Sequence, residues 1–239
     1  MSSLRQQLQE RVNLTLEYHD VLNPKLWDGE RLKDEVSKKL SVIAQTWAGF
    51  AKIPAKAIED IIVVGGNANY NYTPYSDIDL HVVIDVDKVP ECSGLLDEYL
   101  RSKKQLWGLV HDITIRGHNV ELYAQDKTVP YTKGQGVYSI KTDQWLAKPK
   151  KQKVTLDDPA IRQKVEQYVE KIDTLISSGA EDTALQTLKE KFRDMRAAAL
   201  KRGGEFSVEN LVFKELRNLG YIDKVTEYIR SKQDERLSL

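Results

Sequence analysis

Two aspartates separated by a single residue, Asp77 and Asp79, have the spacing in this sequence that most clearly indicates chemistry. They stand at the head of an apolar run that extends to residue 84. Side chains at positions i and i+2 of a strand share a face, so the two carboxylates would lie together while the residues between them pack on the other face. Two adjacent carboxylates repel each other unless a cation lies between them, and such oxygen ligands suit Mg²⁺ or Mn²⁺. The pair predicts a divalent metal site.

A glycine pair precedes these aspartates. Gly65 and Gly66 end a short apolar run over residues 61–64, which is typical of a strand buried on both faces, and the polar loop that follows ends at Ser76. Glycines leave backbone N–H groups accessible to a phosphate at the start of a turn. The order of these features suggests a phosphate cradle beside a metal site.

Taken with Glu121, these residues resemble the nucleotidyltransferase superfamily of the DNA polymerase beta type. In that family a small pair ends one strand, two carboxylates open the next, and a third acid lies on a later strand between apolar residues. The resemblance implies a catalytic and metal-binding set of Asp77, Asp79 and Glu121. It implies a nucleotide-binding set of Gly65, Gly66, Asn67 and Ser76. The implied reaction is two-metal, in-line displacement at the α-phosphate of a nucleoside triphosphate, with transfer of the monophosphate to a hydroxyl acceptor and release of pyrophosphate.

The sequence also departs from the family pattern. Many members have a serine at the position of Gly66, and Asn67 is then the candidate substitute donor. The loop tyrosines could stack on a base or be ordinary loop residues. Basic residues of the helical part often neutralise the leaving phosphates in this superfamily, and the unranked candidates here are Lys189, Lys191, Arg193 and Lys214.

Composition limits the classes of partner. Lysine plus arginine and aspartate plus glutamate number 36 each, so no global basic charge favours nucleic acid, and the acceptor is expected to be a small molecule or a protein more than an RNA. A single cysteine excludes an internal disulfide framework, and no signal peptide or membrane span is recognisable. The expected location is the cytoplasm. The rival interpretation is a non-catalytic nucleotide-, RNA- or protein-binding module on the same fold.

Periodicity predicts an α+β protein, with a small mixed sheet of the nucleotidyltransferase type flanked by helices and followed by a C-terminal helical region. Helices are expected over residues 4–16, 32–50 and 95–106, and a hairpin over residues 111–125 turns around residues 117–119. The expected division is a catalytic domain over 1–147, a basic linker over 148–157 and a helical domain over 158–239.

Overall fold

The structure, a computed structural model, describes residues 14–89, 95–132, 134–151, 156 and 159–238. The chain forms two compact units. The αβ unit comprises Tyr18–Gln152, and the helical unit comprises Met1–Glu17 with Lys153–Leu239. The boundary after residue 152 falls within the expected linker, whereas residues 14–17 belong to the helical unit and not to the first domain, which differs from the expected division. Most of the helix expected over residues 4–16 lies outside the described residues, and residues 14–16 are not helical.

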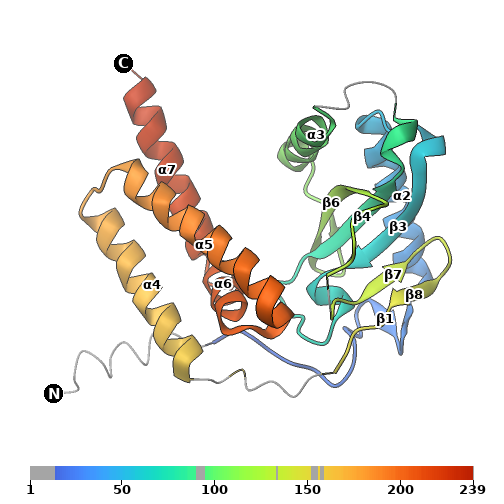
Figure 1. Ribbon diagram of the computed structural model, residues 1–239, viewed down its shortest axis with the longest axis horizontal. Coiled ribbons are helices and arrows are strands. Elements are labelled where there is room, and N and C mark those ends of the chain that lie inside the picture. The colour runs from blue at the N-terminus through green and yellow to red at the C-terminus, as the bar shows by residue number, and fades with distance from the viewer. Residues whose placement is uncertain (1–13, 90–94, 133, 152–155, 157–158, 239) are drawn as a thin grey trace. The chain divides into compact units, whose positions relative to one another are not determined.

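A mixed sheet forms the centre of the αβ unit, as expected (Figure 1). Its strand order is β5-β6-β4-β3-β7-β8, in which β4 and β6 are parallel and the other neighbours are antiparallel. The strands are β3 (Ile58–Val64), β4 (Ile78–Ile84), β5 (Thr114–Ile115), β6 (His118–Asp126), β7 (Val137–Ser139) and β8 (Gln144–Ala147). A separate two-stranded ribbon pairs β1 (Trp27–Asp28) with β2 (Arg31–Leu32).

Side-chain alternation along β4 divides the sheet into two faces. Ile78, Leu80 and Val82 are fully buried in the main core, whereas Asp79 and His81 point to the other face and are partly exposed. On β3, Ile62 and Val64 contribute to a small second core on that other face. The prediction that Asp79 lies on one face of β4 while Ile78, Leu80 and Val82 pack on the other is therefore confirmed.

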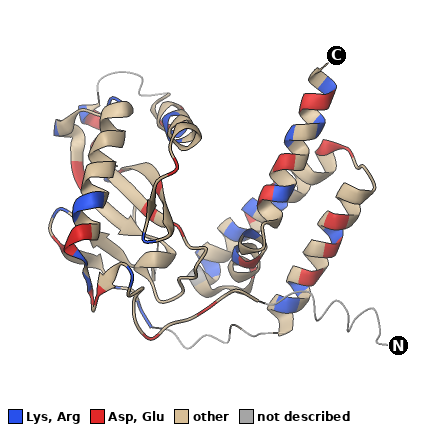
Figure 2. Ribbon diagram, turned by 180° about the vertical axis from the view of Figure 1, so that it is seen from behind, with Lys and Arg blue, Asp and Glu red and all other residues tan. Residues whose placement is uncertain are grey.

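Two helices cover the face that carries the main core. They are α2 (Asp34–Phe50), whose buried stripe includes Leu40 and Trp47, and α3 (Leu96–Val110), which buries Leu100 and Trp107. The helix α2 lies behind the sheet in Figure 1 and in front of it in the reversed view of Figure 2. The helix α3 continues four residues past its expected end, and this extension includes the buried Trp107, whereas Tyr99 is 38% exposed.

The predicted hairpin is present, but its turn is one position earlier than expected. Arg116 and Gly117 have φ values of 53° and 85°, and two successive positive φ angles are typical of the two-residue turn that suits the twist of paired strands. His118 is consequently the first residue of β6 and is buried.

The helical unit contains α4 (Pro159–Ser177), α5 (Asp182–Gly203), α6 (Val208–Asn218) and α7 (Tyr221–Leu237). Ile172, Leu188, Phe192 and Leu216 lie in its common core. The segment of residues 14–17 joins this unit through a buried carboxylate: Thr15 donates to Glu215 from its backbone N at 2.8 Å and from Oγ1 at 3.1 Å. None of the helices in the described ranges has the length and hydropathy needed to cross a bilayer.

Candidate functional site

Two of the predicted acids lie side by side on adjacent parallel strands. Asp79 of β4 is the direct register partner of Glu121 of β6, and it faces Val64 of β3 on its other side. Register partners in a sheet project to the same face, so both carboxylates belong to the partly exposed face. Asp77 immediately precedes β4 and is also partly exposed. The structure thus places Asp79 and Glu121 side by side, with Asp77 two residues before Asp79 at the same end of β4.

Gly65 makes room for the Asp79 carboxylate. Its backbone has φ 76° and ψ −158°, a conformation essentially restricted to glycine. A Cβ atom at this position would lie 1.7 Å from Oδ2 of Asp79. The carboxylate therefore packs directly against the backbone at the end of β3.

The loop after Gly65 begins with a short 3₁₀ turn over Gly66–Ala68. Gly66 lies beside Ser76, whose Oγ would be 3.2 Å from an added Cβ. The same Oγ accepts a hydrogen bond from the backbone N of Thr73 at 2.9 Å. The two ends of the loop therefore meet, which puts the predicted nucleotide-binding residues Gly65, Gly66 and Ser76 next to the aspartates.

Asn67 lies beneath this loop and is completely buried. Its Nδ2 donates to the carbonyl oxygens of Ser76 and Asp77, both at 3.0 Å, and its Oδ1 accepts from Nδ2 of Asn23 at 2.8 Å. Asn67 thus ties the start of the loop to the residue that carries the first carboxylate. Its contact with a nucleotide, expected from the resemblance, remains a prediction.

A buried histidine at the hairpin, His118, contacts the same Ser76 carbonyl oxygen as Asn67. Nδ1 of His118 lies 2.7 Å from the Ser76 carbonyl, which can only accept, so this nitrogen carries the proton. Its Nε2 lies 2.9 Å from Nδ2 of Asn23 and accepts from it. The sequence places His118 in the hairpin turn, and no local pattern indicates its contacts with Ser76 and Asn23.

The loop tyrosines divide into two kinds. Tyr70 and Tyr72 are 8% and 9% exposed, and Tyr72 stacks on His19 with ring centroids 3.8 Å apart. Tyr75 is 57% exposed. Burial assigns the first two rings to anchoring the loop, so Tyr75 is the loop tyrosine whose ring is available for stacking on a base.

Glu121 has two partners that sequence reasoning did not identify. Lys104 of α3 places Nζ 3.1 Å from Oε2 of Glu121, and the hydroxyl of Tyr123 donates to the same oxygen at 2.6 Å. Lys104 also lies over the Tyr123 ring, 3.3 Å from its centroid. Burial, followed by the hydrogen bond to Glu121 and the charges of Glu121, Asp79 and Asp77, raises the pKa of Tyr123 well above its usual value. This phenol therefore stays protonated and acts as a donor to the acidic cluster.

His81 follows the aspartates on the same face of β4. Its Nδ1 lies 2.7 Å from Oε1 of Gln125, and its ring is tilted against Tyr123. Burial lowers the pKa of His81 despite the Gln125 contact, and the nearby charge of Lys104 acts in the same direction. A neutral His81 adds no positive charge to the site at pH 7.

Asp79 and Glu121 share one face, with the Gly65 backbone against Asp79, and oxygen ligands of this kind suit a hard divalent cation. Within the described ranges, however, no three His, Cys, Asp or Glu side chains are already grouped closely enough to hold a metal ion. The Lys104 contact accounts for part of this arrangement, because an ammonium group next to Glu121 neutralises a carboxylate that would otherwise need a cation. Asp77, Asp79 and Glu121 would hold the metal once Glu121 exchanges its partner.

Comparisons with known proteins give little further information. No family model matches the chain, and no curated protein matches it. A solved structure with a detectable likeness is the STING-associated CdnE c-di-GMP synthase from Capnocytophaga granulosa, at 12% identity. That likeness covers 86% of this chain and 83% of the other, with a TM-score of 0.23. At this TM-score the likeness carries no argument, and the function is argued from the site itself.

Proposed function

We propose that this protein is a metal-dependent nucleotidyltransferase that transfers a nucleoside monophosphate from a nucleoside triphosphate to a hydroxyl acceptor, with release of pyrophosphate. The observation that carries the proposal is the pairing of Asp79 with Glu121 across β4 and β6, with Asp79 packed on the side-chain-free backbone of Gly65. An aspartate that only terminated a surface strand would need neither the glycine-only backbone nor an acidic neighbour in register.

The chain's own residues have distinct tasks in this reaction. Gly65 gives the Asp79 carboxylate its place against the backbone, Asn67 and Ser76 hold the loop in its conformation, and the phosphates would bind at this loop. Asp77, Asp79 and Glu121 supply the oxygen ligands. Mg²⁺ or Mn²⁺, when bound, would neutralise charge on the triphosphate and make the acceptor hydroxyl more acidic. The exposed Tyr75 ring is the candidate surface for the base.

The acceptor is proposed to be a small molecule or a protein hydroxyl. Charges of both signs are interspersed along the helices of the helical unit (Figure 2), and the whole sequence has a formal net charge of +0. Such a surface lacks the continuous basic tract with which proteins bind nucleic-acid backbones.

The test is transfer or pyrophosphate release from α-labelled triphosphates of all four bases, with Mg²⁺ or Mn²⁺ and a mixed pool of acceptors. Wild type is compared with Asp77→Asn/Asp79→Asn and with Asp97→Asn, an exposed aspartate on α3 that serves as the matched control. Metal-dependent turnover in wild type and in the control, together with its loss in the double variant, would support the proposal. Turnover that survives the double substitution would refute it.

A second candidate is a non-catalytic binding module, which the contact between Lys104 and Glu121 favours. If that ion pair is permanent, Glu121 never becomes a metal ligand and the site binds a nucleotide or a macromolecule without turnover. Equal nucleotide binding by wild type and the double variant, with no turnover in either, would support this alternative.

A further inference from the structure

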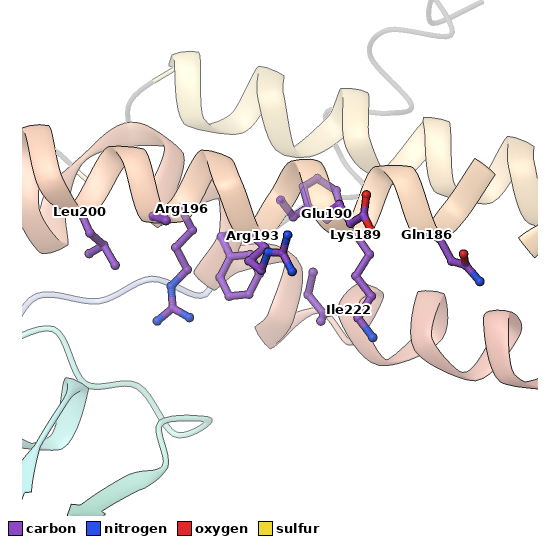
Figure 3. Close-up of a pocket in the computed structure, with 10 residues that line it drawn as sticks. Gln186, Lys189, Glu190, Arg193, Arg196, Leu200 and Ile222 are labelled. Atoms are coloured by element: carbon purple, nitrogen blue, oxygen red, sulfur yellow. The ribbon is translucent and has the colours of Figure 1, made fainter. Parts of the chain in front are cut away.

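The helical unit contains a pocket that the proposed reaction does not use. It lies along α5, with contributions from α6 and α7, and has a volume of about 600 Å³ (Figure 3). Pockets for small organic ligands typically have volumes of about 300–1,000 Å³. The pocket is therefore large enough for a ligand with a ring system.

Three cations line the pocket from one face of α5. Lys189, Arg193 and Arg196 follow each other at spacings of four and three residues, which places them in a row on one side of a helix. In Figure 3, Lys189 and Arg196 extend to the same side, with Ile222 between them. Glu190 is the one acidic residue among those that line the pocket. The row gives the pocket an excess of positive charge.

Two of these cations, Lys189 and Arg196, are held in place without being neutralised, whereas Nε of Arg193 lies 3.4 Å from Oδ1 of Asp194 in an ion pair. Nζ of Lys189 donates to Oγ1 of Thr226 on α7 at 3.0 Å, and Nε of Arg196 donates to Oδ1 of Asn210 on α6 at 3.3 Å. Both acceptors are uncharged, and among the described residues neither cation forms an ion pair with a carboxylate. These hydrogen bonds order the two side chains before a ligand binds, which lowers the entropic cost of binding. The charges of the two side chains remain available to an anion.

Apart from Gln186, the rest of the lining is apolar and partly aromatic. Phe192, Phe213, Leu200 and Ile222 contribute to it, and the Arg196 guanidinium lies over the Phe213 ring at 4.9 Å from its centroid. A planar guanidinium stacked on a ring favours a planar partner and can pair with a carboxylate or phosphate through two parallel hydrogen bonds. We infer that this pocket binds an aromatic organic anion, with the ring system on the apolar floor and the anionic group at Lys189 and Arg196.

The test uses a pair of isosteric probes with the full-length protein. 1-Naphthoate carries the anion, and 1-naphthamide has the same shape without charge. Binding is followed by methyl NMR, with Ile222 and Leu200 as reporters of the pocket. Leu109 of α3, which is 84% exposed, reports nonspecific adsorption. Naphthoate is expected to shift the Ile222 and Leu200 signals saturably and to bind about tenfold more tightly than the amide, as expected for charge-assisted hydrogen bonds.

Variants test whether Lys189 and Arg196 are the source of the preference for naphthoate over naphthamide. Lys189→Gln/Arg196→Gln keeps polar side chains of adequate length, and it should reduce the preference for naphthoate to about twofold or less, since its source has been removed. Lys171→Gln, an exposed lysine on α4, is the matched control and should retain the preference. Far-UV circular dichroism verifies that the helices remain folded. Equal affinity for acid and amide in wild type, shifts confined to Leu109, or a preference that survives the double substitution would each overturn the inference. The readouts are independent of nucleotide transfer.

Discussion

Substitution of Gly65 by alanine adds one Cβ atom, which should both destabilise the αβ unit and displace the Asp79 carboxylate of the candidate site. The backbone conformation of Gly65 costs a non-glycine residue about 1–3 kcal/mol. The added Cβ would also stand 1.7 Å from Oδ2 of Asp79, whereas ordinary contacts are about 3.5 Å, so the carboxylate must move by more than about 1 Å. We expect a total loss of about 2–4 kcal/mol in the free energy of unfolding of the αβ unit.

The neighbouring glycine provides the control. The backbone of Gly66 does not have a positive φ, and the nearest atom to an added Cβ would be Oγ of Ser76 at 3.2 Å. Gly66→Ala should therefore cost only about 1 kcal/mol, because a shift of Ser76 by a few tenths of an ångström relieves the contact and keeps its hydrogen bond to Thr73. The pair of variants separates the effect of the Asp79 contact from the general effect of adding a methyl group to the loop.

Urea denaturation followed by tryptophan fluorescence measures the difference in stability between the two glycine variants, and it reports the unfolding of the αβ unit. The four tryptophans of the chain are Trp27, Trp47, Trp107 and Trp145, all within the αβ unit. Mn²⁺ affinity, measured by electron paramagnetic resonance, is the second readout and should fall at least tenfold in Gly65→Ala because Asp79 is displaced. If the two glycine variants unfold at the same urea concentration, or if Gly65→Ala binds Mn²⁺ as wild type does, the reasoning about the cradle is wrong.

Three further variants test other parts of the structure. Lys104→Met removes a cation that competes with the metal for Glu121, so the Mn²⁺ affinity measured by calorimetry should rise. The expected factor is only about fivefold, because the side chains of Lys104 and Glu121 are both partly exposed. An unchanged or lower Mn²⁺ affinity would contradict this prediction. Asn67→Ala removes the donor to the Asp77 carbonyl and one of the two donors to the Ser76 carbonyl, which keeps His118. It should lower the free energy of unfolding, measured by urea denaturation and tryptophan fluorescence, by about 1–3 kcal/mol, and a loss clearly below about 1 kcal/mol would show that the loop does not depend on Asn67. Burial raises the pKa of Glu215, so the folded state holds this proton more tightly than the unfolded state. The free energy of unfolding of the helical unit should then decrease as the pH rises from about 4.5 through the raised folded pKa of Glu215. Glu215→Gln should make this free energy less dependent on pH, as measured by denaturation followed by circular dichroism at 222 nm.

The parts of the αβ unit that follow from local patterns were predictable from the sequence. Alternation along residues 78–84 predicts both the strand and the face that its carboxylates occupy, and the four apolar residues before Gly65 predict a strand buried on both faces. Helical spacing predicted α2 to within two residues at its start. The pattern is informative here because burial of one face makes apolar residues recur with the period of the strand or helix.

The surroundings of the site depend on contacts between distant parts of the chain. Lys104 reaches Glu121 across 17 residues and Asn23 reaches His118 across 95, and no local pattern encodes either pairing. The register that sets Asp79 beside Glu121 is likewise a parallel pairing with α3 and β5 between its strands, which a single sequence does not specify. The burial of Tyr70 and Tyr72 follows from aromatic partners that precede the loop by some fifty residues.

The contact between Thr15 and Glu215 has a consequence for the order in which the two units are made. The two residues are 200 positions apart, and the whole αβ unit lies between them in the sequence. During synthesis the ribosome releases every strand of the sheet before α4 begins, so the αβ unit can fold while residues 14–17 still lack their partner. Glu215 must then bury its carboxylate against a backbone N–H that was synthesised 200 positions earlier. We therefore expect the helical unit to form after the αβ unit, because residues 14–17 can complete it only once residue 215 and the helices around it have been synthesised.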